Sequence, residues 1–382
     1  MSEPIKFKVF DKTFSVKKNY QSEYNFKIKS NLGDYQVEYT DDSNFINKIN
    51  ALLQDNRKNI LFCDEKVYKL YGKRFHVEKS QLFIGPANEE FKTIGGALQL
   101  IDFMQETGFT KQEKLIVVGG GIIQDVAAFA GATYKRGIEW CFFPSTLLAM
   151  CDSCIGAKSS INYKGVKNQL GLFSAPNNII INIDFIKTLD NKDISNGLGE
   201  IYKLCIVGGV NFVSLYNSLV CKGRINKDKD YVKLIQAALF IKKSVIEVDE
   251  FDLSYRKSLN YGHTFGHALE VMSNFEIPHG QAVAIGIVLV NDISKNRKFL
   301  EKDVNDALKL PIMELLDKKT LNIMGKIIIK DIGRLLLKDK KTLNGKVNFI
   351  MLNNVGNTRL APIEWNAKLE DELNSIVGHN FK

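Results

Sequence analysis

The chain has 382 residues, of which 45% are hydrophobic and 25% charged, as in an ordinary globular protein with room for two domains. The N-terminus shows no signal-peptide pattern, and the longest apolar run (282–290) is too short to cross a membrane, so we expect a cytoplasmic protein without a membrane partner. The net charge of +9 comes from dispersed lysines rather than one basic run, which disfavours nucleic acid as a partner.

Short apolar runs alternate with helical patterns through the first half of the chain. Buried strands are predicted at 59–63, 81–84, 114–118, 140–143 and 178–182, helices at 97–103 and 126–132, and a peripheral strand at 35–39. This alternation is typical of a largely parallel sheet with crossover helices. From about residue 190, helical stretches such as 231–248 and 281–299 dominate. We therefore predict an α/β domain over 1–187 and a mostly α-helical domain over 188–382.

A glycine-rich turn, Gly119-Gly120-Gly121, follows the strand at 114–118 and opens a predicted helix. Glycines let a ligand approach the backbone closely, and a helix N-terminus offers N–H groups to a phosphate. The dinucleotide fingerprint GxGxxG is not matched, because Gln124 stands where it requires glycine. Pyrophosphate binding is the favoured interpretation, and a tight turn without a ligand is the alternative.

Three of the five histidines, His263, His267 and His279, cluster in one short segment of the chain. On a helix, His263 and His267 project from the same face. A third imidazole from the following turn would complete the ligands that a divalent transition metal needs. The alternative is a set of surface histidines without a metal.

Polar residues gather in the glycine-rich segment that contains Asp152, Lys158, Lys167 and Asn168. Lysine and asparagine in such a segment can bind a phosphate or a carboxylate, although a solvated loop has the same composition. In the same segment Cys151 and Cys154 form a lone CxxC, which is a weak signal for a redox or structural zinc site.

Further charged residues precede and flank the histidines. Glu200 and Lys203 are three positions apart on a predicted helix, a spacing that by itself is typical of a surface ion pair. Lys242 and Arg256 lie on either side of Asp249-Glu250, and they too can be read as surface charges.

Taken together, these segments resemble the 3-dehydroquinate synthases, the founding members of the sugar phosphate cyclase family, from about residue 64 to residue 356. The shared motifs, in the family's order and approximate spacing, are Gly119-Gly-Gly-Ile-Ile-Gln-Asp125, Tyr134-Lys-Arg-Gly137, Pro144-Ser-Thr-Leu-Leu-Ala149, Lys167-Asn168 and Arg256-Lys-Ser-Leu-Asn-Tyr-Gly-His-Thr-Phe-Gly-His267.

The resemblance implies a homodimer with a Rossmann-like NAD-binding domain followed by a helical metal- and substrate-binding domain. It implies a catalytic zinc, or alternatively cobalt, held by Glu200, His263 and His279. The resemblance assigns His267 to the substrate phosphate. The helical spacing alone suggests that His267 binds the metal together with His263. Three protein ligands leave an open position, as a catalytic metal requires.

The resemblance also implies the other site residues. Its NAD contacts are Asp64, Glu89, Lys92, Gly119, Gly120, Gly121, Asp125, Ser145, Thr146 and Thr188. Its substrate contacts are Asp152, Lys158, Lys167, Asn168, Lys203, Lys242, Arg256, Asn260 and His267. Arg136 would reach the phosphate bound by the neighbouring subunit, and one lysine of 340–341 would contact the substrate carboxylate.

The implied reaction converts 3-deoxy-arabino-heptulosonate 7-phosphate to 3-dehydroquinate and phosphate. It proceeds by transient oxidation with NAD, phosphate elimination, reduction and intramolecular aldol closure. The chain departs from the family pattern at Ser145, Ala157, Ser159, Lys192-Asp193 and Gln281. These departures leave open a related cyclase for another sugar phosphate. A polyol phosphate dehydrogenase and a binding protein without catalysis are further alternatives.

Overall fold

The computed structural model describes residues 3–40, 44–55, 58–221, 223–225, 227–338 and 345–381. They form two compact units, which we call the sheet unit (Ser22–Asp190) and the helical unit (Met1–Gln21 with Asn191–Lys382). No helix among the described residues is long and apolar enough to cross a membrane.

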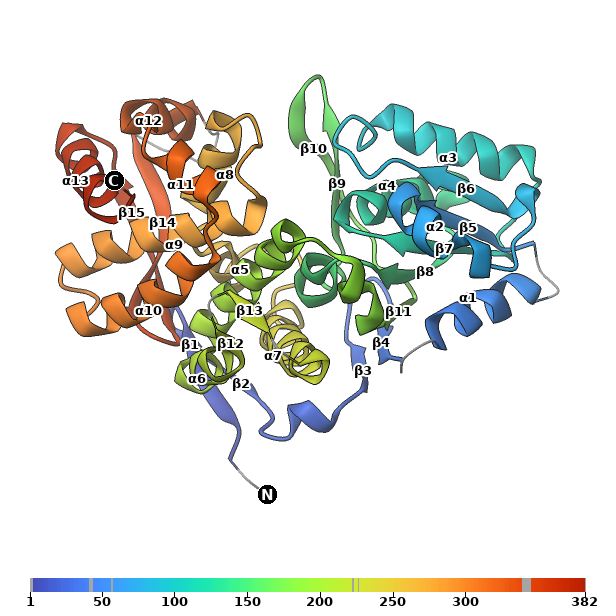
Figure 1. Cartoon of the computed structure of the whole chain (residues 1–382), viewed down its shortest axis with the longest axis horizontal. Helices are drawn as coiled ribbons and strands as arrows, with labels where there is room; N and C mark the ends of the chain where they lie inside the picture. The colour runs from blue at the N-terminus through green and yellow to red at the C-terminus, as the bar shows by residue number, and fades with distance from the viewer. Residues whose placement is uncertain are drawn as a thin grey trace. The chain divides into compact units, whose positions relative to one another are not determined.

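A seven-stranded sheet organises the sheet unit (Figure 1). Its spatial order is β3 (Asn25–Ile28), β4 (Tyr35–Tyr39), β11 (Asn178–Ile181), β8 (Glu139–Pro144), β7 (Lys114–Gly119), β5 (Ile60–Asp64) and β6 (Leu82–Gly85). All neighbours are parallel except the β3–β4 pair. The central strands β5 and β7 are almost wholly buried, which explains their continuous apolar sequences. Every strand predicted from the sequence is confirmed.

The helices of this unit are α1 (Asn44–Gln54), α2 (Glu65–Tyr71), α3 (Ile94–Glu106) and α4 (Gly121–Thr133), with short turns η2 (Gly72–Arg74), η3 (Lys79–Gln81), η4 (Tyr134–Arg136) and η6 (Ile183–Thr188). A π-helix, η5 (Ala149–Ser153), precedes a hairpin of β9 (Lys158–Tyr163) and β10 (Val166–Phe173). The polar segment that the sequence left open as a solvated loop is therefore a π-helix followed by an ordered hairpin.

The strand order reverses beside β5. From β5 the chain passes to β6 on one side, and it then returns to place β7 on the other side. In open α/β sheets such a switch point leaves a crevice at the carboxyl ends of the two strands, where ligands bind. Here those ends are Asp64 and Gly119.

The helical unit contains α5 (Asn191–Gly208), α6 (Val210–Leu219), α7 (Asp228–Ile246), η7 (Tyr255–Asn260), α8 (His263–Met272), α9 (His279–Asn296), α10 (Lys302–Leu315), α11 (Lys318–Met324), α12 (Ile329–Lys338) and α13 (Ala367–Phe381), with η1 (Tyr20–Ser22) at its edge. The small ribbon of β12 (Val220–Cys221) and β13 (Arg224–Ile225) follows α6. Residues 280–294 of α9 are all buried, so α9 forms the core of this unit.

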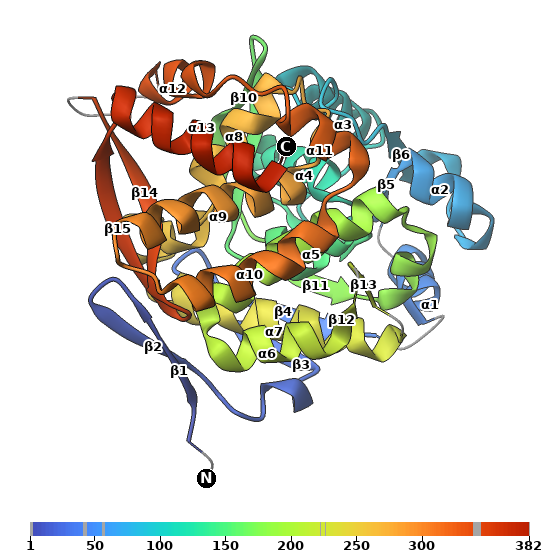
Figure 2. The ribbon, with the colours of Figure 1, turned by 60° about the vertical axis from the view of Figure 1, so that its left-hand side comes forward.

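A four-stranded sheet completes the helical unit (Figure 2). Its order is β14 (Lys346–Asn354), β15 (Asn357–Glu364), β1 (Ile5–Val9) and β2 (Lys12–Val16), with β1 parallel to β15. The sequence analysis placed β1 and β2 with the α/β domain, whereas this strand pairing puts them in the helical unit. Local patterns could not reveal a pairing between segments at opposite ends of the chain. The predicted fold class, a Rossmann-like α/β unit and a mostly helical one, is confirmed.

Candidate metal and cofactor sites

Helices α5 and α9 approach each other unusually closely beside the predicted metal ligands. A Cβ atom on Gly280 would lie 1.9 Å from the main-chain oxygen of Asn196, and one on Gly199 would lie 2.3 Å from that of Gly280. Only glycine fits at either position, because a real Cβ cannot come so near to backbone. Glu200 follows Gly199 and His279 precedes Gly280, so this close contact brings the two side chains together.

Glu200, His263 and His279 form a cluster of possible metal ligands from α5, α8 and α9. Oε1 of Glu200 lies 3.5 Å from Nε2 of His263 and 3.4 Å from Nε2 of His279. Ligands about 2.1 Å from a tetrahedral ion are roughly 3.4 Å apart, so the spacing suits such an ion. Glu200 is completely buried, and its Oε1 has no hydrogen-bond donor within the described part of the chain. A buried carboxylate oxygen without a donor fits a ligand atom.

The ring orientations also suit a metal. Nδ1 of His279 lies 3.1 Å from Oε2 of Glu270, and Nδ1 of His263 lies 3.3 Å from the main-chain oxygen of Tyr261. An acceptor at Nδ1 fixes the tautomer with a lone pair on Nε2, which is the usual arrangement of metal-binding histidines. Both Nε2 atoms then face Glu200.

The charges around the cluster fit a cation. Burial alone would raise the pKa of Glu200, but Lys203 and the two imidazoles offset it and hold the pKa well below its usual range. Burial and the ammonium of Lys203 hold the pKa of His263 well below its usual range, so its ring is neutral, as a ligand must be. Burial opposes protonation of His279, but Glu200 and Glu270 raise its pKa to about 10. A metal ion would supply the positive charge that these carboxylates otherwise draw onto His279.

A second group of possible ligands shares His279. His267, Glu270 and His279 also lie within ligand distance of one another. His267 is exposed and its ring stacks on that of His279, with 5.9 Å between centroids. The group around the buried Glu200 is the better site, because it contains an acceptor without a donor and is shielded from water.

The predicted pyrophosphate turn lies at the switch point of the large sheet. Gly120 is the N-terminal cap of α4, and the amide of Ser145, just after β8, donates to the carbonyl of Gly119 at 2.8 Å. A Cβ on Gly120 would lie 2.9 Å from the side chain of Thr146, whereas one on Gly121 would approach nothing closer than 3.8 Å. Of the two, only Gly121 could carry a side chain without a clash, and the turn places a helix N-terminus at the switch point, where pyrophosphate commonly binds.

Two other predicted NAD contacts lie at the ends of α2. Asp64 caps its N-terminus by accepting from the amides of Lys66 and Val67, at 2.7 and 3.4 Å, and burial raises the pKa of its carboxyl. At the other end, the hydroxyl of Tyr71 lies 3.4 Å from that of Thr188 on η6. One oxygen of Asp64 is therefore occupied by the helix cap.

One polar network joins several predicted cofactor and substrate contacts. Lys92 pairs with Asp125 on α4 at 2.6 Å and donates to Oδ1 of Asn168 at 2.8 Å. Glu89 pairs with Lys167 on β10 at 2.7 Å. Burial opposes ionisation of Glu89, but Lys167, the amide of Asn162 and Lys92 together lower its pKa. At Asp125 burial dominates and raises the pKa. The structure therefore brings together residues that the sequence analysis divided between two ligands.

Asn162 on β9 completes this network, and the sequence analysis missed it. Its amide donates to Oε2 of Glu89 at 2.7 Å, and its oxygen accepts from the amide of Asn168 at 3.0 Å. No sequence motif distinguishes an asparagine in a short strand.

The sequence analysis also missed Glu270, although its position two helical turns after His263 placed both residues on the same face of a helix.

Gln124, which replaces the last glycine of the GxGxxG pattern, has a structural role of its own. Its side chain donates to the main-chain oxygen of Ser153 at 2.8 Å and accepts from the Ser153 hydroxyl at 2.6 Å. This pair fastens α4 to the π-helix that carries Asp152. π-Helical turns are rare in proteins, and those that occur are frequently found at functional sites.

The turn before Lys158 has an unusual backbone. Gly156 and Ala157 have φ of 99° and 58°, both in the left-handed region. A residue with a Cβ costs roughly 1 kcal/mol there. At Ala157 the resembled family has glycine, so this departure adds strain to the turn that leads into β9.

The predicted basic contacts of the helical unit come from elements that pack against one another. Lys203 lies on α5, Lys242 on α7 and Arg256 on η7, and all three side chains are buried. Lys203 also contacts Glu200, so this pair is buried and is not the surface ion pair that its spacing favoured. Lysine and arginine gathered on adjoining elements are the residue types that bind phosphate and carboxylate groups. Asn260 ends η7, close in sequence to His263.

Gln281, where the family has glutamate, does not contact the metal cluster. Its amide donates to the hydroxyl of Ser195 at 2.9 Å and to Oδ2 of Asp317 at 3.1 Å, and its oxygen accepts from the amide of Asp317 at 3.3 Å. It therefore ties the first turn of α9 to α5 and α11. A glutamate here would face the carboxylate of Asp317, which explains the amide.

Other predicted residues belong to none of these clusters or fall outside the described part of the chain. Arg136 is exposed on η4, where its φ is 63°. Lys340 and Lys341 lie outside the described residues. Cys151 and Cys154 are buried thiols, and neither belongs to the two possible ligand groups found among the described residues.

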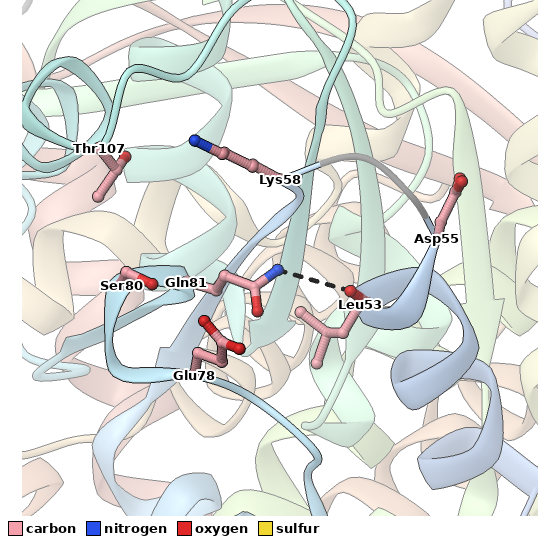
Figure 3. A pocket seen from close by; sticks show the side chains of 7 residues that line it. All are labelled: Leu53, Asp55, Lys58, Glu78, Ser80, Gln81 and Thr107. Carbon is pink, nitrogen blue, oxygen red and sulfur yellow. Dashed lines mark hydrogen bonds between the residues drawn. The ribbon is translucent and has the colours of Figure 1, made fainter.

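A pocket of about 370 Å³ lies where strands β5 and β6 of the large sheet begin, at the opposite end of these strands from the glycine turn (Figure 3). Lys58 and Gln81, which precede β5 and β6, line it together with Glu78 and Thr107. None of the predicted site residues lines this cavity.

Two solved structures that share this fold contain NAD+ and a divalent metal. One is 2-deoxy-scyllo-inosose synthase complexed with carbaglucose-6-phosphate, NAD+ and Co2+, with a TM-score of 0.80 over 93% of this chain and all of that one, at 19% identity. Another is the 2-epi-5-epi-valiolone synthase ValA of Streptomyces hygroscopicus with NAD+ and Zn2+, with a TM-score of 0.76 over 90% and 97%, at 22% identity. At these identities the likeness shows the fold alone.

Sequence comparison is more specific. The family models "3-dehydroquinate synthase N-terminal" and "3-dehydroquinate synthase C-terminal" match residues 82–196 and 197–342. The 3-dehydroquinate synthase of Alkaliphilus metalliredigens is 34% identical over 313 residues, which cover 79% of this chain and 85% of that protein. The chain belongs to the 3-dehydroquinate synthase family.

Proposed function

We propose that this protein is a 3-dehydroquinate synthase that converts 3-deoxy-arabino-heptulosonate 7-phosphate to 3-dehydroquinate and phosphate in aromatic amino acid biosynthesis. The observation that carries the proposal is the Glu200–His263–His279 cluster, in a chain 34% identical to a 3-dehydroquinate synthase over most of its length. A buried carboxylate with two oriented imidazoles supports a three-ligand catalytic metal.

The cofactors proposed are NAD and a divalent metal, zinc or cobalt. The turn at Gly119–Gly121 is the proposed site for the pyrophosphate of NAD, because it places a helix N-terminus at a switch point of the sheet. When bound, NAD supplies reversible hydride transfer and the metal supplies Lewis-acid polarisation of a substrate oxygen.

The chain's own residues bind and orient the substrate. Lys203, Lys242 and Arg256 bring buried positive charge to a substrate that carries a phosphate and a carboxylate. Lys158, Lys167 and Asn168 are the proposed contacts from the hairpin of the sheet unit, and Asp152, Asn260 and His267 complete the proposed set. A substrate without a carboxylate would leave Arg256 without its proposed role.

We further propose a homodimer, in which the exposed Arg136 reaches the phosphate bound by the neighbouring subunit. Sedimentation equilibrium would show the dimer as a mass of twice 43.2 kDa. Replacement of Arg136 by alanine should raise KM for the substrate without changing the sedimenting mass. A protein that sediments as a monomer at the concentration of the activity assay contradicts this part of the proposal.

The test of the reaction is phosphate release by zinc-loaded protein with NAD and 3-deoxy-arabino-heptulosonate 7-phosphate. The 340 nm absorbance and the product mass are followed in the same reaction. We expect phosphate and dehydroquinate without net NADH, because the hydride is returned in each turnover. The Glu200→Gln variant, which keeps the shape of the side chain, serves as the inactive control.

Two results would contradict the proposal. Protein that binds NAD and zinc but releases no phosphate from this substrate acts on another sugar phosphate, and sedoheptulose 7-phosphate and glucose 6-phosphate would be tried next. Net accumulation of NADH with a polyol phosphate would identify a dehydrogenase.

A further inference from the structure

The turn that leads into β9 cannot hold its shape by local preference. Gly156 and Ala157 are consecutive left-handed residues, with φ of 99° and 58°, and Lys158 follows directly as the first residue of the strand. An alanine in this region is disfavoured and persists only where surrounding contacts determine the conformation. The direction in which Lys158 leaves the backbone therefore depends on those contacts.

Tyr35 supplies a contact that stabilises this turn from a distant strand. Its hydroxyl accepts a hydrogen bond from the buried amide of Gly156 at 2.8 Å, across 121 residues of sequence. Tyr35 lies on β4 and is 3% exposed, so its ring is fixed by the sheet. On the other side of the turn, the amide of Ser174 donates to the carbonyl of Ala157 at 2.8 Å. The strained pair is thus held at both of its residues.

The strand after the turn is also fixed. The hydroxyl of Ser159 donates to the main-chain oxygen of Asp125 at 3.1 Å, and the amide of Ser160 approaches Oδ1 of Asp125 at 3.4 Å. Both contacts join β9 to α4, the helix whose N-terminus forms the glycine turn. The exposed side chain of Lys158 therefore lies between the held Gly156–Ala157 turn and the Ser159–Ser160 segment fixed to α4.

We propose that Tyr35 is a positioning residue that holds the Gly156–Ala157 turn, so that Lys158 presents its ammonium group to the anionic substrate. This gives the strand at 35–39 a role in catalysis beyond closing the sheet. The substrate in this inference rests on the proposed function. Whether Tyr35 holds the turn does not depend on the proposed function.

The matched variants are Tyr35→Phe and Tyr39→Phe. Both tyrosines belong to β4, but the hydroxyl of Tyr39 is buried without a hydrogen-bond partner in the described part of the chain. Tyr35→Phe should lower kcat/KM for phosphate release about tenfold, because it removes the acceptor of a buried amide beside Lys158. Tyr39→Phe should leave kcat/KM within about twofold of the wild type, since its hydroxyl makes no bond.

A rescue experiment separates positioning from stability. Glycine tolerates a positive φ, so Ala157→Gly should relieve the strain that makes the Tyr35 bond necessary. We expect the double variant Tyr35→Phe/Ala157→Gly to recover most of the lost kcat/KM. If Tyr35→Phe lowers the melting temperature but leaves kcat/KM unchanged, its role is structural and the inference is wrong.

Amide hydrogen exchange tests the turn without any substrate. In the full-length protein, Tyr35→Phe should accelerate exchange at Gly156 at least about tenfold, whereas Tyr39→Phe should not. If the wild type releases no phosphate, the proposed function fails, and exchange still decides whether Tyr35 holds the turn. Exchange and kcat/KM that are the same in the two variants would overturn the inference.

Discussion

The two overlapping ligand groups make opposite predictions for two histidines on one helix. His263 and His267 lie one helical turn apart on α8, and the same substitution at each gives a matched pair of variants. We predict that His263→Ala abolishes tight metal binding and that His267→Ala retains it, because Nε2 of His263 faces the buried Glu200 whereas the ring of His267 is exposed.

The size of the effect follows from the ligand count. Structural zinc sites with four ligands bind with about 10–16 kcal/mol, or roughly 3 kcal/mol for each ligand. Loss of His263 should therefore weaken metal binding more than about a hundredfold. Glu270→Gln removes only the carboxylate 3.1 Å from Nδ1 of His279, so it should weaken binding about 10–100-fold. Glu200→Gln should be as damaging as His263→Ala.

Competition with a chromogenic chelator for cobalt or zinc measures these affinities, and circular dichroism checks that each variant is folded. Equal losses in His263→Ala and His267→Ala would refute the ligand assignment. A larger loss in Glu270→Gln than in Glu200→Gln would instead favour the group that contains His267.

Three further predictions concern residues that support the packing of the helical unit. Gln281→Glu should lower the free energy of unfolding by about 2 kcal/mol, because it opposes two carboxylates, and adding Asp317→Asn should restore it; urea titrations without recovery in the double variant would contradict this. Gly280→Ala should cost about 3 kcal/mol and weaken metal binding, since its Cβ would meet α5 at 1.9 Å, whereas Gly378→Ala, with open space around it, should not destabilise. Asp292→Asn should cost about 3 kcal/mol at pH 7. Burial opposes ionisation of Asp292, but two lysines and an amide lower its pKa. Its contribution is therefore present at neutral pH and is lost as the pH falls below about 4, so wild type and variant should converge in acid, and a pH-independent gap would argue against this origin.

Asp292 illustrates why such support is invisible in the sequence. Its carboxylate accepts from Lys295, Lys309, Asn305 and Asn380, on α9, α10 and α13. Only the first of these lies within one helical turn of it. The others meet it because three helices pack together.

Local sequence patterns were sufficient to predict the strands of the large sheet, the helix periods and the glycine turn. These features depend on burial and spacing between near neighbours, which apolar patterns record directly. The order of the motifs predicted the family, and the comparisons confirmed it. The scarcity and spacing of the histidines indicated where a metal site should be sought.

How the distant parts meet depends on tertiary packing. The Gly199–Gly280 contact places Glu200 beside two imidazoles, although Glu200 lies far before both of them in the sequence. Tyr35 reaches Gly156, and the first strand joins β15, by hydrogen bonds that no local pattern encodes. Such contacts form because whole elements bury their apolar faces against one another, so their polar partners are chosen by packing rather than by neighbours in sequence.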